Sequence, residues 1–367
     1  MKILFLSDAR SYHTTRWVNY FIERGHQCFL ISLDYDSINS LSNQSFPTKA
    51  EEFVIPRKFL PNFLKYPLSL RRIRKIVTKI KPDLVNAHFV PNYGLIGALL
   101  KAHPLVISTW GSDVLISPGK SWLHKLRAKY VLKKADLVTT DAEITAQAVY
   151  NLGVERKKVV VSPMGVERYL VAQQIKKEKA YYLVLSNRRL EPVYDLSTLI
   201  KAIPLVIKEV KTNLKFVILG EGSQKDHLIH LAKELKIESN VEFKGVVSRE
   251  KLLEYYRQAD IYVSTSKSDS TSVSLLEAMN FGLIPIVTDI PGNREWIDEH
   301  KNGFLFPGSG HQALAEKIIY VINEFTQWQT FREKNEAIIK NRAVWEDNMQ
   351  AIEAEFSKLL DGDIFNR

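Results

Sequence analysis

Short apolar runs alternate with amphipathic stretches along the first half of the chain. The runs are apolar at nearly every position, which is typical of strands that are buried on both faces of a parallel sheet. The stretches between them repeat apolar side chains every three or four residues, and they therefore predict helices that cover such a sheet. We predict strands at Lys2–Ser7, Gln27–Leu33, Leu84–His88, Leu105–Thr109, Leu137–Thr140 and Val159–Ser162. We predict helices near Thr14–Arg24, Leu68–Ile80, Tyr93–Ala102, Trp122–Lys134 and Glu143–Leu152.

The same alternation starts a second time after a polar stretch. Residues 172–179 have no structural period, which is typical of a linker. A last helical region, Trp328 to Leu360, has no strand after it. The second series predicts strands at Tyr182–Leu185, Lys215–Leu219, Val241–Phe243, Ile261–Ser264, Ile284–Thr288 and Phe304–Phe306.

These patterns predict an α/β protein with two Rossmann-like doubly wound domains that face a cleft. We place the first domain at residues 1–168, the linker at 169–180 and the second domain at 181–340. We expect a C-terminal helix within residues 341–367 to cross back to the first domain.

The composition fits a globular protein, with 45% hydrophobic and 25% charged residues in a chain of 367. Cys28 is the only cysteine, so an internal disulfide and a thiolate metal cage are excluded. The first residues are too few for a signal peptide, and no apolar run reaches the roughly 18 residues of a membrane span. We therefore expect a cytoplasmic location.

The formal net charge of +10 is concentrated in one segment. Residues 57–81 contain nine Lys or Arg residues and no acid, and their apolar residues fall at helical spacing. Such a helix would be attracted to an anionic membrane surface by roughly 1 kcal/mol for each basic residue close to it. The alternative is a helix packed on the sheet with a solvated basic face. No recognised nucleic-acid motif accompanies the charge, so we do not expect nucleic acid as a partner.

Candidate chemistry should follow the strands, because ligands of open parallel sheets bind outside the carboxyl ends of the strands. Arg188 and Arg189 follow a predicted strand and offer forked donors to a phosphate or carboxylate; a surface ion pair is the alternative. Gly220 and Gly222 permit a tight turn and a close backbone approach, either to a ligand or within a plain turn. The backbone of Val247 could pair with a nucleobase edge.

The loop that ends at Ser274 has the most distinctive content. It is rich in Ser and Thr and precedes a helix, whose free N–H groups form an anion site. Glu277 lies about one turn inside that helix, where its carboxylate can accept from both hydroxyls of a ribose, at roughly 1.5–3 kcal/mol for each bond. The alternative is an acid that complements the helix dipole, worth about 0.3–1 kcal/mol.

At this loop the chain resembles a known family. Asp269 is followed eight positions later by Glu277, in the setting Ser-Leu-Leu-Glu-Ala-Met-x-x-Gly-x-x-Pro. This arrangement is similar to the glutamate-x7-glutamate signature of the group 1 glycosyltransferases, retaining enzymes with the two-Rossmann GT-B fold. Further segments match the family in order and approximate spacing: 189–192, 220–222, 259–262, 287–295 and 302–306.

The resemblance implies a role for each matching position. Glu277 would hold the ribose of a nucleotide sugar, Asp269 would contact the donor sugar and Arg189 would face the diphosphate. Val247 would lie near the base. The sugar and phosphate path would be lined by the backbone amides of Ser270, Thr271, Ser272, Val273 and Ser274.

Two positions depart from the family pattern. Asp269 stands where the family has a glutamate, and Tyr194 stands where it usually has a lysine, five residues after Arg189. One charge partner of the diphosphate is therefore missing, and Arg188 or Lys267 could replace it.

Loops of the first domain would then meet the acceptor. We predict acceptor contacts from Arg10, His13, Arg16, Trp110 and Asp113, each with a structural role as the alternative. Relatives often have a histidine where Trp110 stands, so a catalytic histidine is not carried over to that position. His88 ends a predicted strand, and we place it with Asp269 and Arg189 among the catalytic candidates; a satisfied structural histidine is its alternative.

The sequence thus predicts a retaining glycosyltransferase that moves a hexosyl unit from a nucleoside diphosphate sugar to a saccharide or lipid-linked saccharide, in cell-surface polysaccharide synthesis. We expect neither a metal nor another cofactor. Two alternatives stay open. One is a nucleotide-sugar epimerase of the same fold, which needs no acceptor, and the other is a non-catalytic homologue that binds saccharide.

Overall fold

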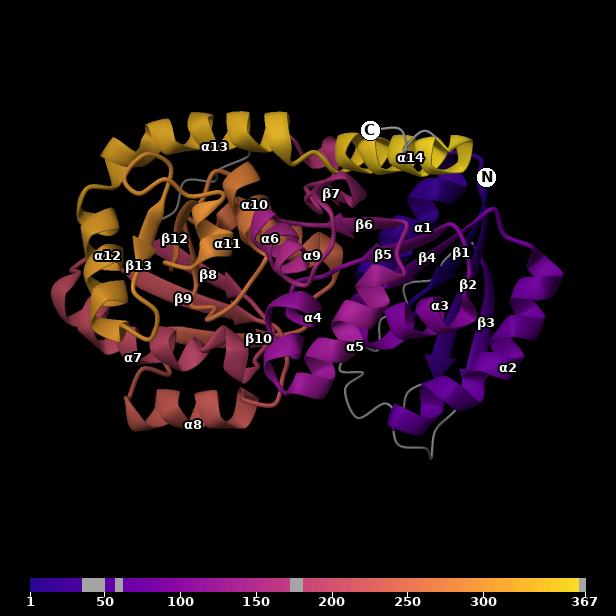
Figure 1. Cartoon of the computed structure of the whole chain (residues 1–367). Helices are drawn as coiled ribbons and strands as arrows, with labels where there is room; N and C mark the ends of the chain where they lie inside the picture. Colours follow the sequence, from indigo (N-terminus) through magenta and orange to yellow (C-terminus); the bar gives the residue numbers. More distant parts are fainter. Residues whose placement is uncertain (35–49, 57–61, 172–180, 363–367) are drawn as a thin grey trace. The chain divides into compact units, whose positions relative to one another are not determined.

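The chain forms two compact units, and the structure, a computed structural model, describes residues 1–34, 50–56, 62–171 and 181–362 (Figure 1). The first unit contains residues 1–163 together with 347–367, and the second contains residues 164–346. The boundary thus lies at Pro163, five residues before the predicted position, and most of the predicted linker falls outside the described residues.

Seven parallel strands form the sheet of the first unit, in the order β3-β2-β1-β4-β5-β6-β7. They are β1 Lys2–Leu6, β2 Gln27–Asp34, β3 Glu51–Pro56, β4 Leu84–His88, β5 Leu105–Ser108, β6 Leu137–Thr140 and β7 Val159–Val161. Only β3 was not predicted. It begins with two glutamates and ends on Pro56, so it lacks the apolar run of a central strand, and it lies at the edge of the sheet, where proline is tolerated.

Helices cover this sheet and connect its strands. They are α1 Tyr12–Glu23, α2 Asn62–Ile80, α3 Leu95–Leu100, α4 Ser112–Leu115, α5 Trp122–Lys133, α6 Glu143–Asn151 and α14 Trp345–Asp361. The predicted helix Tyr93–Ala102 is instead a π-helix, η1 Phe89–Gly94, followed by α3. The helix α14 packs on α1, because the rings of Phe21 and Phe356 stack with their centroids 5.4 Å apart.

Six parallel strands form the sheet of the second unit, in the order β10-β9-β8-β11-β12-β13. They are β8 Tyr182–Asn187, β9 Leu214–Leu219, β10 Val241–Gly245, β11 Ile261–Ser264, β12 Ile284–Thr288 and β13 Phe304–Phe306. The helices are α7 Leu196–Glu209, α8 Lys225–Glu234, α9 Arg249–Gln258, α10 Val273–Asn280, α11 Pro291–Arg294, α12 His311–Asn323 and α13 Gln329–Arg342.

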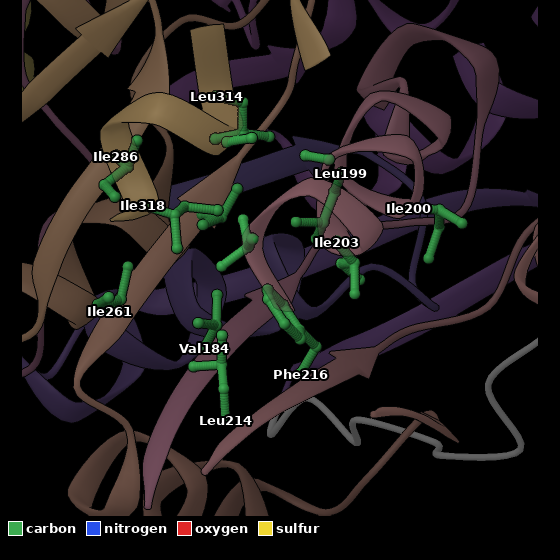
Figure 2. Close-up of a cluster of buried hydrophobic side chains, with 14 of the residues drawn as sticks. Val184, Leu199, Ile200, Ile203, Leu214, Phe216, Ile261, Ile286, Leu314 and Ile318 are labelled. Carbon is green, nitrogen blue, oxygen red and sulfur yellow. The ribbon is translucent and has the colours of Figure 1, made fainter. Parts of the chain in front are cut away.

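The core of the second unit lies where α7 and α12 pack on one face of the sheet. Leu199 and Ile203 of α7 and Ile318 of α12 point toward Phe216 of β9 (Figure 2). Helical spacing in α7 directs these apolar side chains to one face. Burying each of them contributes about 1.5–3 kcal/mol, so this core holds the β8 and β11 strands on which the site depends.

The predicted helical region from Trp328 to Leu360 is divided into α13 and α14. Between them Val344 pairs with Val166 in a parallel bridge. Gly165 has a φ of +62°, and a Cβ at that position would lie 2.7 Å from the carbonyl oxygen of Ala343. A close approach of two backbones therefore interrupts the helix at this point.

Both sheets contain the strand order of a doubly wound fold, 3-2-1-4-5-6 when numbered within each unit, and the first sheet adds a seventh strand beside the sixth. Two such Rossmann-like α/β domains are the predicted architecture, which the structure confirms. In this order the connections reverse direction between the first and fourth strands, and ligands bind at that switch point. The switch points lie between β1 and β4 and between β8 and β11. Across the described ranges, no helix is both long and apolar enough to span a bilayer.

Candidate active site

Arg188 lies at the switch point of the second unit, directly after β8. Its Nη1 donates to the hydroxyls of Ser272 (2.7 Å) and Ser274 (3.0 Å), which begin α10. Its Nη2 donates to the carboxylate of Asp269 in the loop after β11. Because β8 and β11 are neighbours in the sheet, the two loops meet, and they form a largely buried cation and anion pair.

The charge of this arginine is maintained by its surroundings. Burial is the largest single influence and would lower the pKa of Arg188, but Asp269 together with Tyr262, Tyr194 and Tyr256 outweighs burial and holds the pKa above its ordinary range. The guanidinium also lies over the ring of Tyr194, 4.4 Å from its centroid. Arg188 thus brings a positive charge to the position where the family's usual lysine is replaced by Tyr194. Its buried Nε has no hydrogen-bond partner among the residues described.

Arg189, the neighbouring residue, is placed differently. Its side chain is 59% exposed, against 11% for Arg188, and its Nη2 lies 3.5 Å from Glu191 in the same loop. Lys267, the other suggested replacement for the lysine, is also half exposed and pairs with Asp195 at 3.2 Å. Of these three cations, Arg188 is therefore the one that contacts Asp269 and the start of α10.

Glu277 is buried on α10 and is held by two residues of α9. Arg249 donates to its Oε1 at 2.5 Å, and the hydroxyl of Tyr256 donates to its Oε2 at 2.9 Å. Burial raises the pKa of Glu277, and the charge of Arg249 opposes that rise. A carboxylate has about four acceptor positions, so two donors leave it able to accept further hydroxyl hydrogens.

The start of α10 combines backbone amides with hydroxyls. Ser272 is its N-cap, and its hydroxyl accepts from the N–H of Leu275 at 3.4 Å. The hydroxyl of Tyr262 lies 2.8 Å from that of Ser274. The candidate donor-binding residues Ser270, Thr271, Ser272 and Ser274 are all buried, and Val273 is half-buried.

Glycines allow the neighbouring loops to approach this site. A Cβ on Gly292 would lie 2.5 Å from the carbonyl oxygens of both Asp269 and Ser270, so only glycine lets α11 lie against that loop. Gly220 has a φ of +120°, and a Cβ on it would lie 2.5 Å from the carbonyl oxygen of Arg188. A Cβ on Gly222 would collide with the backbone of Leu190. Gly220 and Gly222 thus position the arginine loop.

Three residues that support the site were not predicted as site residues from the sequence. Arg249 and Tyr256 hold Glu277, and Gly292 supports the Asp269 loop. The available signal was the spacing of Arg249 and Tyr256, which are seven residues apart and therefore share a face of α9. Val247, the expected base contact, is half-buried and packs against the core on the α10 side of the sheet.

The site residues of the first unit are largely aromatic. His88, at the end of β4, is 2% exposed and lies with ring centroids 5.1 Å from Trp17 and 5.2 Å from Trp110. His13 lies 5.1 Å from Trp110. The structure thus brings together three of the predicted residues, His13, His88 and Trp110, beside the switch point between β1 and β4.

The remaining candidates of the first unit have other surroundings. Both carboxylate oxygens of Asp113 accept backbone amides, from Val90 at 3.0 Å and from Trp110 at 2.9 Å, so Asp113 joins two loops rather than facing outward. Burial raises its pKa to about 6. Arg10 is exposed and pairs with Asp8 at 3.2 Å, while Arg16 is buried on α1.

The described residues contain no cluster of three or more His, Cys, Asp or Glu side chains arranged to hold a metal ion. The charged groups that the structure does gather are the Arg188 and Asp269 pair and the Arg249 and Glu277 pair. Together with the amides that begin α10, these groups can bind an anion and a diol side by side.

Comparison with known proteins identifies the class of this arrangement. Residues 169–345 match the family described as "Glycosyl transferases group 1", and residues 2–142 match "Glycosyl transferase 4-like". A poly(ribitol-phosphate) α-N-acetylglucosaminyltransferase of Staphylococcus aureus is 32% identical over 37% of this chain, although the match spans only 27% of that relative.

Two further matches extend over most of the chain. A GalNAc-α-(1→4)-GalNAc-α-(1→3)-diNAcBac-PP-undecaprenol α-1,4-N-acetyl-D-galactosaminyltransferase of Campylobacter jejuni is 26% identical, over 79% of this chain and 78% of its own. The crystal structure of HepE from Anabaena in complex with UDP-glucose superimposes with a TM-score of 0.78 at 20% identity, covering 98% of this chain and 100% of that one. Other relatives carry names from colanic acid and teichuronic acid biosynthesis. The chain therefore belongs to the group 1 glycosyltransferases and is a transferase with the two Rossmann-like domains of the GT-B fold.

Proposed function

We propose that this enzyme transfers a hexosyl unit from a nucleoside diphosphate sugar to a saccharide or lipid-linked saccharide, with retention of the anomeric configuration. The observation that carries the proposal is the placement of a buried arginine, Arg188, and a buried carboxylate, Glu277, around the first turns of α10. HepE, which shares the fold, binds UDP-glucose, and the Campylobacter relative is named for a lipid-linked oligosaccharide acceptor. The relatives named for colanic acid and teichuronic acid biosynthesis support a role in cell-surface polysaccharide synthesis.

Each part of the donor has a complementary group in the second unit. Glu277 accepts the two ribose hydroxyls while Arg249 keeps it charged. The diphosphate lies against the amides of residues 270–274 and the guanidinium of Arg188. Asp269 turns from Arg188 to the hydroxyls of the donor sugar once the diphosphate supplies the counter-charge. The ordering of these groups before donor arrives reduces the entropy lost on binding.

The chemical step then depends on stabilising the leaving group. As the bond between the anomeric carbon and the diphosphate breaks, negative charge grows on the diphosphate. The acceptor oxygen bonds to the same carbon, and the proton of its hydroxyl passes to an oxygen of the leaving diphosphate. Arg188 and the amides that begin α10 are fixed donors aimed at that charge, and such donors contribute roughly 3–4 kcal/mol each to lowering a barrier. We propose that no metal or other cofactor takes part, and we expect turnover to persist in EDTA.

Calorimetry with a panel of nucleotide sugars tests the donor assignment. We expect at least one to bind, and we expect Glu277→Gln to weaken it by roughly tenfold to a hundredfold, the cost of one or two charge-assisted hydrogen bonds. The control is Glu299→Gln, which changes a glutamate paired with Lys317 away from α10. Equal binding by Glu277→Gln and the unchanged enzyme would refute the assignment.

Incubation with a lipid-linked oligosaccharide extract distinguishes transfer from the alternatives. Transfer requires the acceptor and yields a lengthened oligosaccharide with release of the nucleoside diphosphate. An epimerase changes the sugar without any acceptor, and a non-catalytic homologue binds saccharide without turnover.

We propose further that α2 contacts the inner face of the cytoplasmic membrane. Its described basic side chains Arg71, Arg72, Arg74, Lys75 and Lys79 are exposed, while Ile73 is buried against the sheet; residues 57–61 of the basic segment lie outside the described residues. Sedimentation with phosphatidylglycerol vesicles, compared with phosphatidylcholine vesicles, measures this contact. We expect Arg71→Ser with Arg72→Ser to reduce binding to the anionic vesicles alone.

A further inference from the structure

His88 lies within a group of aromatic rings at the carboxyl end of the first-unit sheet. Phe5 of β1 meets it edge-on at 6.0 Å between ring centroids, and Trp17 of α1 does so at 5.1 Å. Trp110, in the loop after β5, lies at 5.2 Å and also contacts His13. Residues of β1, α1 and the loop after β5 thus hold the imidazole, which is itself on β4, at the switch point.

The tautomer of His88 follows from its hydrogen bond to Asn86. Its Nε2 lies 2.9 Å from Oδ1 of Asn86, two residues earlier on the same face of β4. The Nδ2 of Asn86 donates to the carbonyl oxygen of Val106 at 3.4 Å and to the hydroxyl of Ser108 at 2.9 Å. A carbonyl can only accept, so this orientation of the amide is fixed and its Oδ1 faces the histidine. The hydrogen must therefore be on Nε2.

A chain of buried hydroxyls holds Asn86 in this orientation. Ser108, on β5, accepts from the hydroxyl of Thr139 on β6 at 2.8 Å. Asn86, Ser108 and Thr139 are all buried and lie on adjacent strands. Buried polar groups need hydrogen-bond partners. Here Thr139 donates to Ser108, Asn86 donates to Ser108, and the N–H of His88 donates to Asn86.

The other nitrogen of the ring is consequently a bare acceptor. Nδ1 of His88 is buried and has no hydrogen-bond partner among the described residues. The indole Nε1 of Trp110, which can only donate, is likewise buried and has no partner among the residues that the structure describes. A hydrogen-bond acceptor and a donor thus lie on two rings in contact, and both lack a partner.

The surroundings keep this imidazole uncharged. Burial first, and then the nearby His13, lower the pKa of His88 to about 3. Burial and the charge of Arg16 lower the pKa of His13 to about 4. Within the described ranges no acidic side chain is hydrogen-bonded to His88, and the carboxylate of Asp113 is engaged by the amides of Val90 and Trp110. A proton acceptor that functions near neutral pH needs a pKa near that pH, so the lowered pKa favours a neutral imidazole that accepts a hydrogen bond over one that takes up a proton.

We propose that His88 and Trp110 form a neutral binding site for a saccharide, in which Nδ1 of His88 accepts a hydrogen bond from a sugar hydroxyl and Nε1 of Trp110 donates to a sugar oxygen. Asn86 is the positioning residue that fixes the tautomer. This inference rests on the proposed function and replaces the catalytic role first expected of His88. A sugar suits the site because its hydroxyls both donate and accept and its C–H faces pack on aromatic rings.

Nuclear magnetic resonance of the full-length enzyme labelled with 15N-histidine tests the tautomer directly. We assign the His88 signals by their loss in His88→Gln, and His103→Gln, which removes an exposed imidazole of the same unit, is the control. We expect a protonated Nε2 and an unprotonated Nδ1 at every pH between about 5 and 8. A protonated Nδ1, or titration of His88 within that range, would overturn the proposal without bearing on donor binding.

Ligand additions test the sugar contact and identify its source. UDP alone should leave Nδ1 of His88 unchanged. The nucleotide sugar that calorimetry shows to bind should shift Nδ1 if the hydroxyl belongs to the donor, and the matching methyl glycoside added with UDP should shift it if the hydroxyl belongs to the acceptor. If neither addition moves Nδ1, His88 is a structural histidine and the proposal fails. If no nucleotide sugar binds at all, the proposed function fails, and the tautomer is still decided by the titration.

A variant of Asn86 separates positioning from structural support. Asn86→Asp places a carboxylate against Nε2, so we expect His88 to titrate between about pH 5 and 8, where the unchanged enzyme shows no titration of this residue. The pH profile of kcat/KM should then gain a new ionisation. Thr78→Ala removes a hydroxyl of α2 that donates to the carbonyl oxygen of Arg74, and it should leave the His88 signals as they were. We expect His88→Gln to lower kcat/KM about tenfold with UDP affinity unchanged. An unchanged pH profile in Asn86→Asp, or an equal loss of UDP affinity in His88→Gln, would contradict the positioning role.

Discussion

The two sheets have the same strand order but opposite chemistry at their switch points. In the second unit, charged side chains meet there: Arg188 with Asp269, and Arg249 with Glu277. In the first unit, the residues that meet are aromatic rings and a histidine, His88, which burial keeps neutral.

This difference shows that the doubly wound fold determines where a ligand binds but not which ligand it is. The adjacent ends of parallel strands bring loops together, and the loop residues decide what is bound. Charges and helix amides suit a nucleoside diphosphate, whereas aromatic faces with single hydrogen-bonding atoms suit uncharged sugars. Variants that remove one of these properties at a time therefore test whether the two switch points differ in this way.

The largest effect should come from removing the buried charge of the second unit. We expect Arg188→Met to lower kcat/KM by roughly a hundredfold to a thousandfold, because a fixed donor aimed at the leaving diphosphate is lost. Steady-state kinetics measures the loss, and circular dichroism checks the fold, since Asp269 is left without its partner.

The neighbouring arginine provides the matched control for that variant. Arg189→Met changes an exposed side chain paired only with Glu191, and we expect less than a threefold change in kcat/KM, as for a surface ion pair. If Arg189→Met causes the larger loss, Arg189 is the diphosphate ligand and our choice of Arg188 is wrong.

The neutral site of the first unit should be visible in the pH dependence of stability. The pKa of His88 is about 3 in the folded protein and about 6.5 when unfolded, so the unfolded chain binds the extra proton. The contribution of His88 to the free energy of unfolding is therefore fully present above about pH 6.5. It is lost as the pH falls toward 3, by about 1.4 kcal/mol per pH unit. Urea denaturation at several pH values measures this slope.

The variant His88→Gln isolates that contribution. Its stability should fall less steeply with acid than that of the unchanged protein. Asp113 has a raised pKa of about 6 and gives a slope of opposite sign, but it is common to both proteins and cancels in their difference. Parallel pH curves for His88→Gln and the unchanged protein would show that the imidazole is not buried in its neutral form.

A third comparison uses two glycines of the second unit. Gly292→Ala forces a methyl group against the carbonyl oxygens of Asp269 and Ser270, and we expect it to cost about 1–3 kcal/mol and to displace the Asp269 loop. Gly308→Ala has open space around its new methyl group and is the control. Gly292→Ala should lower the thermal unfolding temperature and weaken nucleotide-sugar binding, and Gly308→Ala should change neither.

The smallest effect should come from the ring beneath Arg188. Tyr194→Leu removes the aromatic face on which the guanidinium lies, and we expect UDP to bind about two- to fivefold more weakly, in keeping with a loss of about 0.5–1 kcal/mol. Tyr181→Leu removes a comparable contact with Lys215 and should leave UDP affinity unchanged. If both variants bind UDP as the unchanged enzyme does, the ring adds nothing to the position of Arg188.

Most of the fold could be predicted from the sequence because burial on both faces leaves a strong signal in each central strand. The strand β3 gave no such signal, since an edge strand that starts with Glu51 and ends with Pro56 needs no continuous apolar run. The break between α13 and α14 depends on the approach of Gly165 to Ala343, a contact distant in sequence that no helical pattern contains.

The site could be predicted less completely, for a similar reason. The position of Glu277 was evident from its helix, but its partners Arg249 and Tyr256 come from another helix and match no motif. Sequence also cannot tell which of two adjacent arginines turns inward, because that choice depends on the placement of Asp269 across the sheet. The pairing of Asn86 with His88 was within reach, since residues two apart on a strand share a face.

The membership of α14 in the first unit has a consequence for how the protein is made. A ribosome completes residues 164–346, the whole second unit, before it releases the segment that contains Phe356, which is fully buried in the first unit against Phe21. Domains fold as their residues become available during synthesis. The domain that begins the chain is therefore the last to be finished, and a gene fragment that stops at Pro163 encodes it without the helix that covers α1.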